Sequence, residues 1–441
     1  MTRRAARAIL LAASLLLSFA AVHLLMAQEQ KLNKFDRDTT KEMLRVMEGD
    51  IKKNYYDPKF HGLDLDARFR EAEQKIDNAT SMNYALADIA GALDALNDSH
   101  TFFFPPSRPY SHSYGWQITA VGDDKCFITA VRPGSDAEKK GVKVGDQVVQ
   151  INGHDAVRDD LWKMEYVYDV LRPQTALRVV LRSPDGNTRQ VDVQSKMVPK
   201  KRVVESLDDI FQIVRDSENA EWLSRSRYVE VGKGVLIWKL PDFEFSLEHA
   251  DTMLGKIRSS EALILDLRGN PGGIVEVLER ILGGMFEHDV KVADRIGRKP
   301  LKPEVAKTHG KAFTGQLIVL IDSGSASAAE IFARVIQLEK RGVILGDRSS
   351  GSVMEARGYG HQFGTETVIT YGASITEADM IMADGKSLEH VGVTPDQRIL
   401  PTAQDLAAGR DPALARAAEL AGIHMTPEQA GKLFPPEWMP D

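Results

Sequence analysis

Three serines lie between a buried apolar run and an apolar helical segment, where one of them could act as a nucleophile. Residues 316–322 predict a buried strand, residues 323–330 are mostly small, and a helix is predicted from Ile331. A serine at such a junction lies near the helix N-terminus, where unpaired backbone N–H groups and the helix dipole favour negative charge. This environment suits a hydroxyl that becomes an alkoxide and attacks a carbonyl. The same pattern is also typical of a serine that only caps the helix.

A second candidate segment leaves the C-terminal end of another predicted buried strand, at 262–267. It is the turn Asp266-Leu267-Arg268-Gly269-Asn270-Pro271-Gly272-Gly273. Open α/β sheets bind their ligands at the carboxyl ends of the strands. Paired glycines let the backbone approach a ligand and direct N–H groups at it. Taken alone, this turn is also typical of an ordinary connection between a strand and a helix.

The elements around these segments predict an α/β domain between residues 228 and 400. Predicted strands alternate there with predicted helices, at 234–240, 246–257, 262–267, 275–286 and 316–337. This alternation implies a mainly parallel sheet covered on both faces. Residues 34–97 have helical periodicity, and residues 402–441 predict a helical tail that contains prolines.

Residues 114–195 are rich in predicted strands and turns and closely resemble a PDZ domain. The matching segments are Pro133-Gly134-Ser135-Asp136-Ala137, Gly141-Val142-Lys143-Val144-Gly145-Asp146 and Ile151-Asn152-Gly153. The resemblance implies that Tyr114, Gly115, Trp116 and Gln117 form the loop that binds a peptide carboxylate. PDZ domains add an extended peptide to the edge of a sheet, so a polypeptide is the expected partner.

Together, the segments Asp266–Gly273, Ser-Ala-Ser-Ala-Ala-Glu and Gly392-Val393-Thr394-Pro395-Asp396 closely resemble the S41 serine peptidases, which include tail-specific and tricorn-core members. The resemblance implies an N-terminal helical arm, an inserted PDZ domain and a ClpP/crotonase-like α/β core. It implies that Ser327 is the nucleophile and that the amides of Ala328 and of Gly272 or Gly273 form the oxyanion hole. The domains expected on this basis are a helical domain at 34–104, a PDZ domain at 108–197, a peptidase core at 200–400 and a tail at 401–441.

The base for Ser327 distinguishes two branches of that family. The C-terminal processing branch uses a lysine downstream of the serine, but Ser352 occupies the corresponding position, and no lysine occurs between Lys340 and Lys386. The tricorn-like branch uses a histidine from a Ser-His pair at the end of the helical region, which here is Ser99-His100. That resemblance implies that His100 is the base, that Ser99 assists it and that Glu389 holds Ser99 or a water or orients the base. Without the resemblance, His100 is also consistent with a helix C-terminus, and Glu389 with a surface carboxylate.

The N-terminus has the layout of a secretory signal peptide at residues 1–27. Three arginines, Arg3, Arg4 and Arg7, precede an almost wholly apolar stretch that ends at Met26. An uncleaved membrane anchor is the alternative, because the stretch is close to the shortest length that spans a bilayer. Either interpretation places the folded part outside the cytoplasm, in the periplasm or the extracellular space.

Composition excludes several classes of function. The chain has 441 residues, 43% hydrophobic and 27% charged, which is typical of a globular protein of more than one domain. Its net charge of −7 gives no reason to expect a nucleic acid partner, and its single cysteine, Cys126, excludes an intramolecular disulfide. We expect no metal and no cofactor, because the sequence contains no ligand-spaced histidine pair and no nucleotide-binding glycine motif.

The sequence therefore predicts an exported serine peptidase without a cofactor. Its PDZ domain would capture C-terminal or unfolded segments of polypeptides, and Ser327 would cleave them through an acyl-enzyme. A PDZ-containing binding or scaffold protein with a decayed active site is the alternative, because the downstream lysine is missing. Hydrolysis of a small ester also remains open, as does the oligomeric state.

Overall fold

The structure is a computed structural model of the chain, and it describes all residues except 1–31, 200–226, 233, 365–368, 437 and 439–441. The predicted signal peptide and the predicted start of the core at residue 200 lie outside the described residues. Within the described ranges, no helix combines the length and the apolar character needed to cross a membrane.

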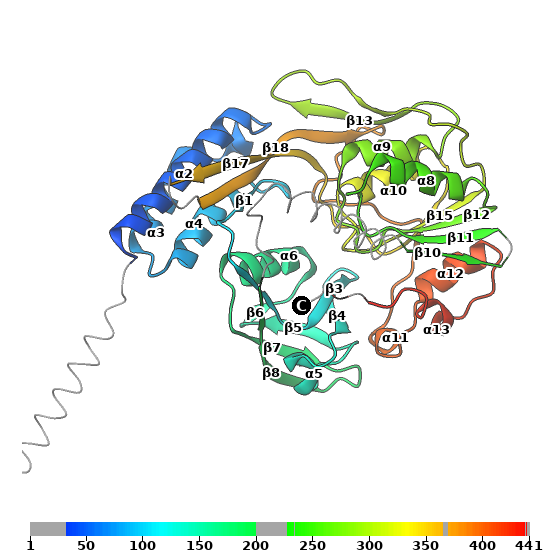
Figure 1. Cartoon of the computed structure of the whole chain (residues 1–441), viewed down its shortest axis with the longest axis horizontal. Coiled ribbons are helices and arrows are strands. Elements are labelled where there is room, and N and C mark those ends of the chain that lie inside the picture. Colours follow the sequence, from blue (N-terminus) through cyan, green and yellow to red (C-terminus); the bar gives the residue numbers. More distant parts are fainter. Residues whose placement is uncertain (1–31, 200–226, 233, 365–368, 437, 439–441) are drawn as a thin grey trace, which may run out of the picture.

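Three helices form the N-terminal arm and pack on a long β-hairpin (Figure 1). The helices are α2 (Lys34–Asn54), α3 (Leu65–Asn78) and α4 (Met82–Asp94). The buried faces of the helices follow helical spacing, as in Met43, Met47 and Ile51 of α2. These side chains share one hydrophobic cluster with Tyr371 and Ile375 of the hairpin, so the arm and the hairpin form one packed unit.

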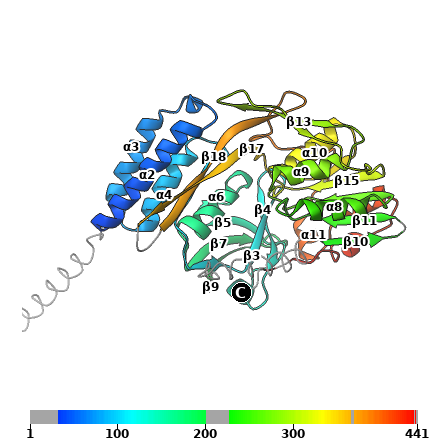
Figure 2. The same cartoon turned by 45° about the horizontal axis from the view of Figure 1, so that its top comes forward.

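The hairpin belongs to a five-stranded antiparallel sheet that connects the arm to the core (Figures 1 and 2). Its strands are β1 (Phe102–Phe104), β13 (Val290–Gly297), β14 (Glu304–Ala306), β17 (Met354–Phe363) and β18 (Ile369–Met382). β1 pairs with β18, with Phe102 opposite Ser374. The turn at 95–101, which includes Ser99 and His100, therefore lies between α4 and this sheet.

A second sheet, of six strands, forms the core, and its order is β10-β11-β12-β15-β16-β19. The strands are β10 (Arg227–Val231), β11 (Val235–Lys239), β12 (Ala262–Asp266), β15 (Gln316–Ile321), β16 (Val343–Gly346) and β19 (Gln397–Arg398). All pairs are parallel except β10 with β11. The mainly parallel sheet expected from the sequence is confirmed, whereas the antiparallel sheet of β13, β14, β17 and β18 was not foreseen.

Side chains alternate between the two faces of the core sheet, and a layer of helices covers each face. Along β15, Leu317, Val319 and Ile321 point to one face, and Ile318 and Leu320 point to the other. The first face is covered by α8 (Leu247–Ile257), α9 (Val275–Gly283) and α10 (Ala328–Leu338).

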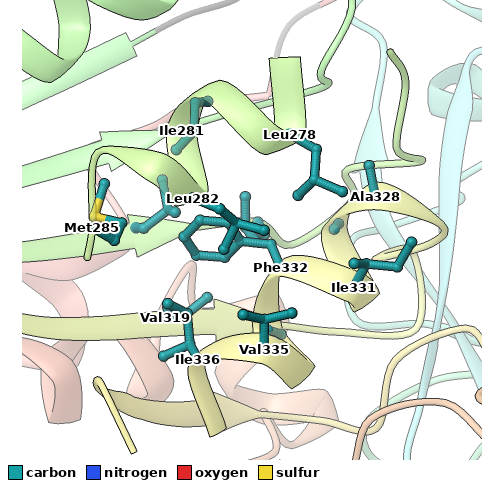
Figure 3. Close-up of a cluster of buried hydrophobic side chains, with 14 of the residues drawn as sticks. Leu278, Ile281, Leu282, Met285, Val319, Ala328, Ile331, Phe332, Val335 and Ile336 are labelled. Carbon is teal, nitrogen blue, oxygen red and sulfur yellow. The ribbon is translucent and has the colours of Figure 1, made fainter. Parts of the chain in front are cut away.

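Figure 3 shows the packing on this first face, where Phe332 of α10 lies against Leu282 of α9 and near Val319 of the sheet. The second face is covered by the helices of the C-terminal tail, mainly α12 (Pro412–Leu420) and α13 (Pro427–Ala430), whereas α11 (Ala403–Ala407) has no buried residue. The segment predicted only as a tail is therefore the second helical layer of the core.

The segment that resembles a PDZ domain forms an antiparallel sheet in the order β3-β4-β5-β7-β8, to which β6 adds by pairing with β5. Its elements are β3 (Trp116–Val121), β4 (Lys125–Val131), α5 (Asp136–Lys139), β5 (Gln147–Ile151), β6 (His154–Asp155), α6 (Leu161–Glu165), the π-helix η3 (Tyr166–Leu171), β7 (Ala176–Arg182) and β8 (Thr188–Gln194). Asn152 and Gly153 both have positive φ in the tight turn between β5 and β6, as an Asn-Gly pair predicts. β2 (Tyr110–Ser113) and β9 (Lys196–Pro199) pair beside this domain.

Candidate active site

Ser327 lies at a sharp turn between β15 and α10, and its backbone is strained. Its φ of 52° and ψ of −117° are unusual for a residue other than glycine. Two hydrogen bonds hold its N–H, one to the carbonyl of Ser352 at 2.8 Å and one to the Glu330 carboxylate at 3.1 Å. Ser327 is also the N-cap residue of α10, so the cap and the nucleophile interpretations are compatible.

The other two serines of the turn have structural partners. The Ser325 hydroxyl is buried and donates to the Leu267 carbonyl at 2.8 Å, and the Ser323 hydroxyl donates to the Ala120 carbonyl of the PDZ segment at 2.6 Å. Both bonds fix the position of the turn. Of the three serines, Ser327 is therefore the one that the geometry favours as a nucleophile.

The paired glycines lie against Ser327. A Cβ on Gly272 would come within 2.7 Å of the Ser327 Cβ and 3.0 Å of the Ala328 nitrogen, so only glycine fits there. The Gly272 N–H already donates to the buried Asn270 side chain at 2.8 Å. Among the described residues, no acceptor is found for the amides of Gly273 and Ala328. The geometry therefore favours Gly273, rather than Gly272, as the partner of Ala328 in an oxyanion hole.

A buried ion network anchors the turn that contains these glycines. Asp266 accepts hydrogen bonds from the Arg268 guanidinium at 2.8 and 2.9 Å, and Arg268 continues to Asp411 of the tail at 2.7 Å. Burial by itself would raise the pKa of Asp266, but the charges of Arg268 and Lys239 lower it well below its usual range. The carboxylate therefore stays ionised and holds Arg268 at the start of the turn.

Ser99, His100 and Glu389 form a hydrogen-bonded chain. The Ser99 hydroxyl donates to Glu389 Oε2 at 2.8 Å, and the Ser99 N–H donates to Oε1 at 2.7 Å. His100 Nδ1 lies 2.8 Å from the same hydroxyl oxygen. Because the Ser99 proton is directed at the carboxylate, its oxygen accepts from His100 Nδ1–H. This assignment leaves Nε2 of His100 with a free lone pair, as a general base requires.

Residues 352 and 353 connect this chain to Ser327. The Ser352 carbonyl accepts the Ser327 N–H at 2.8 Å, and the next amide, from Val353, donates to Glu389 Oε2 at 2.9 Å. The nucleophile and the Ser99–His100–Glu389 chain thus meet on two consecutive residues. No hydrogen bond directly joins His100 and Ser327 in the described part of the chain, and catalytic hydrogen bonds often form only once substrate is bound.

Glu330, in the first turn of α10, holds a neighbouring loop in place. It is fully buried, and it accepts hydrogen bonds from the Ser349 hydroxyl at 2.6 Å and from the amides of Gly351 at 2.7 Å and Ser352 at 2.8 Å, besides Ser327. Burial raises the pKa of Glu330 to about 7 despite these donors. Glu330 therefore holds the loop in which the C-terminal processing branch has its lysine.

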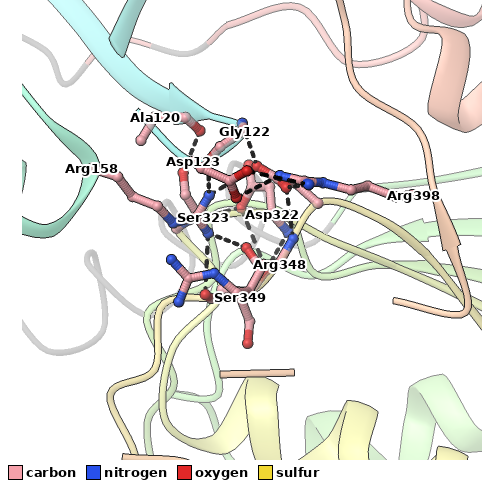
Figure 4. A network of polar contacts seen from close by, with 12 residues as sticks. Ala120, Gly122, Asp123, Arg158, Asp322, Ser323, Arg348, Ser349 and Arg398 are labelled. Atoms are coloured by element: carbon pink, nitrogen blue, oxygen red, sulfur yellow. Dashed lines mark hydrogen bonds and ion pairs between the residues drawn. The ribbon is translucent and has the colours of Figure 1, made fainter. Parts of the chain in front are cut away.

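A buried salt bridge joins this loop to the PDZ segment (Figure 4). Arg158 donates to Asp347 at 2.9 Å and to the Ser349 carbonyl at 3.2 Å, and the Gly122 amide donates to the same carboxylate at 2.8 Å. Arg158 and Asp347 are both almost fully buried. Removing either one would leave the other as an unpaired buried charge and would lower the stability of the fold. No pattern in the sequence predicts this contact.

The loop predicted to bind a peptide carboxylate lies at the start of β3. Tyr114 stacks on Trp116 with 5.8 Å between ring centroids, and its hydroxyl donates to the Gln174 carbonyl at 2.9 Å. Gly115 has a φ of 77°, and a Cβ there would meet the Ser135 side chain at 2.4 Å. Gln117 lies in β3, which is an edge strand of its sheet. The loop is therefore held by these contacts and lies beside a sheet edge at which a peptide strand could add.

The acid limb of the pH–rate profile is expected to have its midpoint below pH 6.5. Burial lowers the pKa of His100 from 6.5, although Asp98 opposes this effect. A general base works in its neutral form, which predominates above the pKa, so kcat/KM should fall only when the pH drops below that lowered value. Peptide hydrolysis measured from pH 4.5 to 8 tests this, and a midpoint above 6.5 would contradict the assignment.

Two family models match the chain. The model of peptidase family S41 matches residues 235–399, and the model of the PDZ domain matches residues 127–183. Over these segments the chain is similar to a PDZ-containing peptidase of family S41.

Two similar proteins are a tail-specific protease and a carboxy-terminal processing protease. The chain is 27% identical over 280 residues to the tail-specific protease of Haemophilus influenzae, covering 59% of this chain and 38% of that protein. It is 27% identical over 295 residues to the carboxy-terminal processing protease CtpB of Bacillus subtilis, covering 64% and 56%. The chain thus spans about two-fifths to three-fifths of the length of these relatives.

Solved structures share the fold. Mature CPAF superposes with a TM-score of 0.63 at 17% identity, over 85% of this chain and 95% of that one. The photosystem II D1 C-terminal processing protease superposes with a TM-score of 0.50 at 19% identity, over 82% and 93%. At these identities the likeness concerns the fold alone.

Proposed function

We propose that this chain is an exported serine-type peptidase that hydrolyses polypeptides through an acyl-enzyme. The observation that supports this most is the convergence of Ser327 and the Ser99–His100–Glu389 chain on residues 352 and 353. The names of the relatives also support it, since they are tail-specific and carboxy-terminal processing proteases.

In the proposed mechanism, His100 Nε2 takes the proton of the Ser327 hydroxyl while Oγ attacks the scissile carbonyl. The amides of Gly273 and Ala328 stabilise the oxyanion of the tetrahedral intermediate, and the imidazolium then protonates the leaving amine. Water, deprotonated by His100, hydrolyses the ester on Ser327 in the second half of the reaction. Ser99 and Glu389 orient the imidazole and stabilise its positive charge.

The substrates in this proposal are C-terminal or unfolded segments of polypeptides, held by the PDZ domain at Tyr114, Gly115, Trp116 and Gln117. No cofactor takes part. The proposal places the helical domain at 34–104, the PDZ domain at 108–197, the core at 200–400 and the tail at 401–441. It places the mature protein in the periplasm or outside the cell, with residues 1–27 as a signal peptide or, alternatively, an anchor.

Labelling with a fluorophosphonate probe and hydrolysis of an unfolded protein test the proposed function together. We expect the probe to label purified chain at Ser327 and the chain to degrade an unfolded protein faster than a small ester. Labelling elsewhere, or turnover confined to esters, would contradict the proposal. A binding protein with a decayed site, suggested by Ser352 in place of the lysine, would bind polypeptides without labelling or turnover.

A further inference from the structure

A groove runs along the edge of the PDZ sheet and ends beside the candidate active site. It is a cavity of about 590 Å³ between β3 and the helical segment of α6 and η3. Its lining includes Trp116, Ile118 and Thr119 of β3 and also Gly269 of the turn that contains the paired glycines. Figures 1 and 2 show α6 on the side of the PDZ sheet that faces the hairpin and the core. A segment added to β3 would therefore lie next to the candidate active site.

Two carboxylates, Glu165 and Asp169, line the helical wall of this groove. They are four residues apart in the sequence, so they lie on the same face of the helical segment. Among the described residues, no lysine, arginine or histidine forms an ion pair with either one. Both residues are exposed. The groove walls restrict their hydration and raise the pKa of Glu165 to about 7 and that of Asp169 to about 6. A cation between them would favour the charged form of both.

The spacing of the two carboxylates matches the repeat of an added strand. Side chains one turn apart on a helix have Cβ atoms about 5–6 Å apart, and two strand residues advance about 6.6 Å. Alternate side chains of a bound strand point to the same side, so two of them would face the two carboxylates in turn.

We propose that Glu165 and Asp169 make the PDZ groove selective for polypeptide segments with lysine or arginine at two alternate positions. The inference rests on the proposed function, because it names the class of substrate that the groove presents to Ser327. An acidic segment would place like charges together in the groove and would be rejected.

Binding is measured on the full chain with Ser327→Ala, so that the probe is not consumed. The probe is a short fluorescent peptide with a free C-terminal carboxylate and lysine at two alternate positions, and it is compared with matched peptides that have glutamine or glutamate there. A fourth peptide has the two lysines shifted by one residue. We expect a peptide with lysines in one of the two placements to bind about 10-fold more tightly than the glutamine peptide. The peptide with lysines in the other placement should not have this advantage.

The double substitution Glu165→Gln/Asp169→Asn should reduce this discrimination to less than about twofold. The control Asp124→Asn/Asp155→Asn removes the same net charge from exposed positions of the same domain outside the groove and should retain the full discrimination. Equal discrimination in both double variants would overturn the proposal. A second test keeps Glu165 and Asp169 and raises NaCl from about 0.05 M to about 0.5 M. Screening should weaken the binding of the lysine peptide and leave that of the glutamine peptide unchanged.

The outcomes separate this inference from the proposed function. If the peptides bind with the expected discrimination but the chain with Ser327 intact cleaves no polypeptide, the proposed function fails and the selectivity stands. If polypeptides are cleaved and Ser327 is labelled, but lysine, glutamine and glutamate peptides bind alike, the selectivity is wrong and the proposed function stands.

Discussion

Replacing either Ser327 or His100 by alanine is expected to lower kcat for peptide hydrolysis by about 10⁶-fold, and replacing both should lower it no further. The reason is that the hydroxyl and its base act as one unit, so that the loss of one makes the other useless. A residual rate above that in water should survive in all three variants, because the amides of Gly273 and Ala328 remain in place. Single-turnover kinetics on an unfolded protein substrate measure these ratios.

His288 supplies the matched control for this experiment. Its ring is exposed, and its Nε2 lies 3.9 Å from the carboxylate of Glu339, at the opposite end of α10 from Ser327. His288→Ala should therefore change kcat by less than about threefold, an effect typical of a surface position. If His100→Ala retains full activity, or if the losses in the double variant multiply, His100 is not the base of Ser327.

Replacing the buried Glu330 by alanine is expected to lower the free energy of unfolding by about 3 kcal/mol and kcat by about 100-fold. The substitution leaves the buried donors of Ser349, Gly351 and Ser352 without their shared acceptor. The loop then no longer fixes the positions of Ser327 and Glu389 relative to each other, although Glu330 itself touches no substrate. Urea unfolding and steady-state kinetics measure the two effects.

Glu339 is the C-cap residue of the same helix and is exposed, so Glu339→Ala should change stability by less than about 0.5 kcal/mol. Glu330→Gln adds a diagnostic of charge. Because the folded protein raises the pKa of Glu330 from 4.5 to about 7, the native state binds a proton more tightly than the unfolded state between these values. The stability of the unmodified chain relative to Glu330→Gln should therefore decrease by about 3 kcal/mol from pH 4.5 to pH 7. A difference independent of pH would contradict the raised pKa.

The local chemistry of this chain could be predicted from its sequence. Runs of apolar residues at strand and helix spacing predicted the parallel core, and the Asn152-Gly153 pair predicted a tight turn, because both signals are short-range. The antiparallel sheet around β17 and β18 was missed, since strands that pair across many residues have no local signal of their partner. The tail was predicted to be helical, but its position over the second face of the core depends on packing.

By itself, the sequence determined which segments contain reactive groups: the turn at Ser327, the glycine pair at 272 and 273, and Ser99-His100. Only the tertiary structure decided how they meet. Glu389 reaches Ser99 across 290 residues, and Arg158 reaches Asp347 across 189. It also distinguished Gly273 from Gly272 and gave Glu330 its four donors. The physical reason is that residue type and spacing fix local backbone geometry, whereas the partners of a buried charge are fixed only when distant segments pack together.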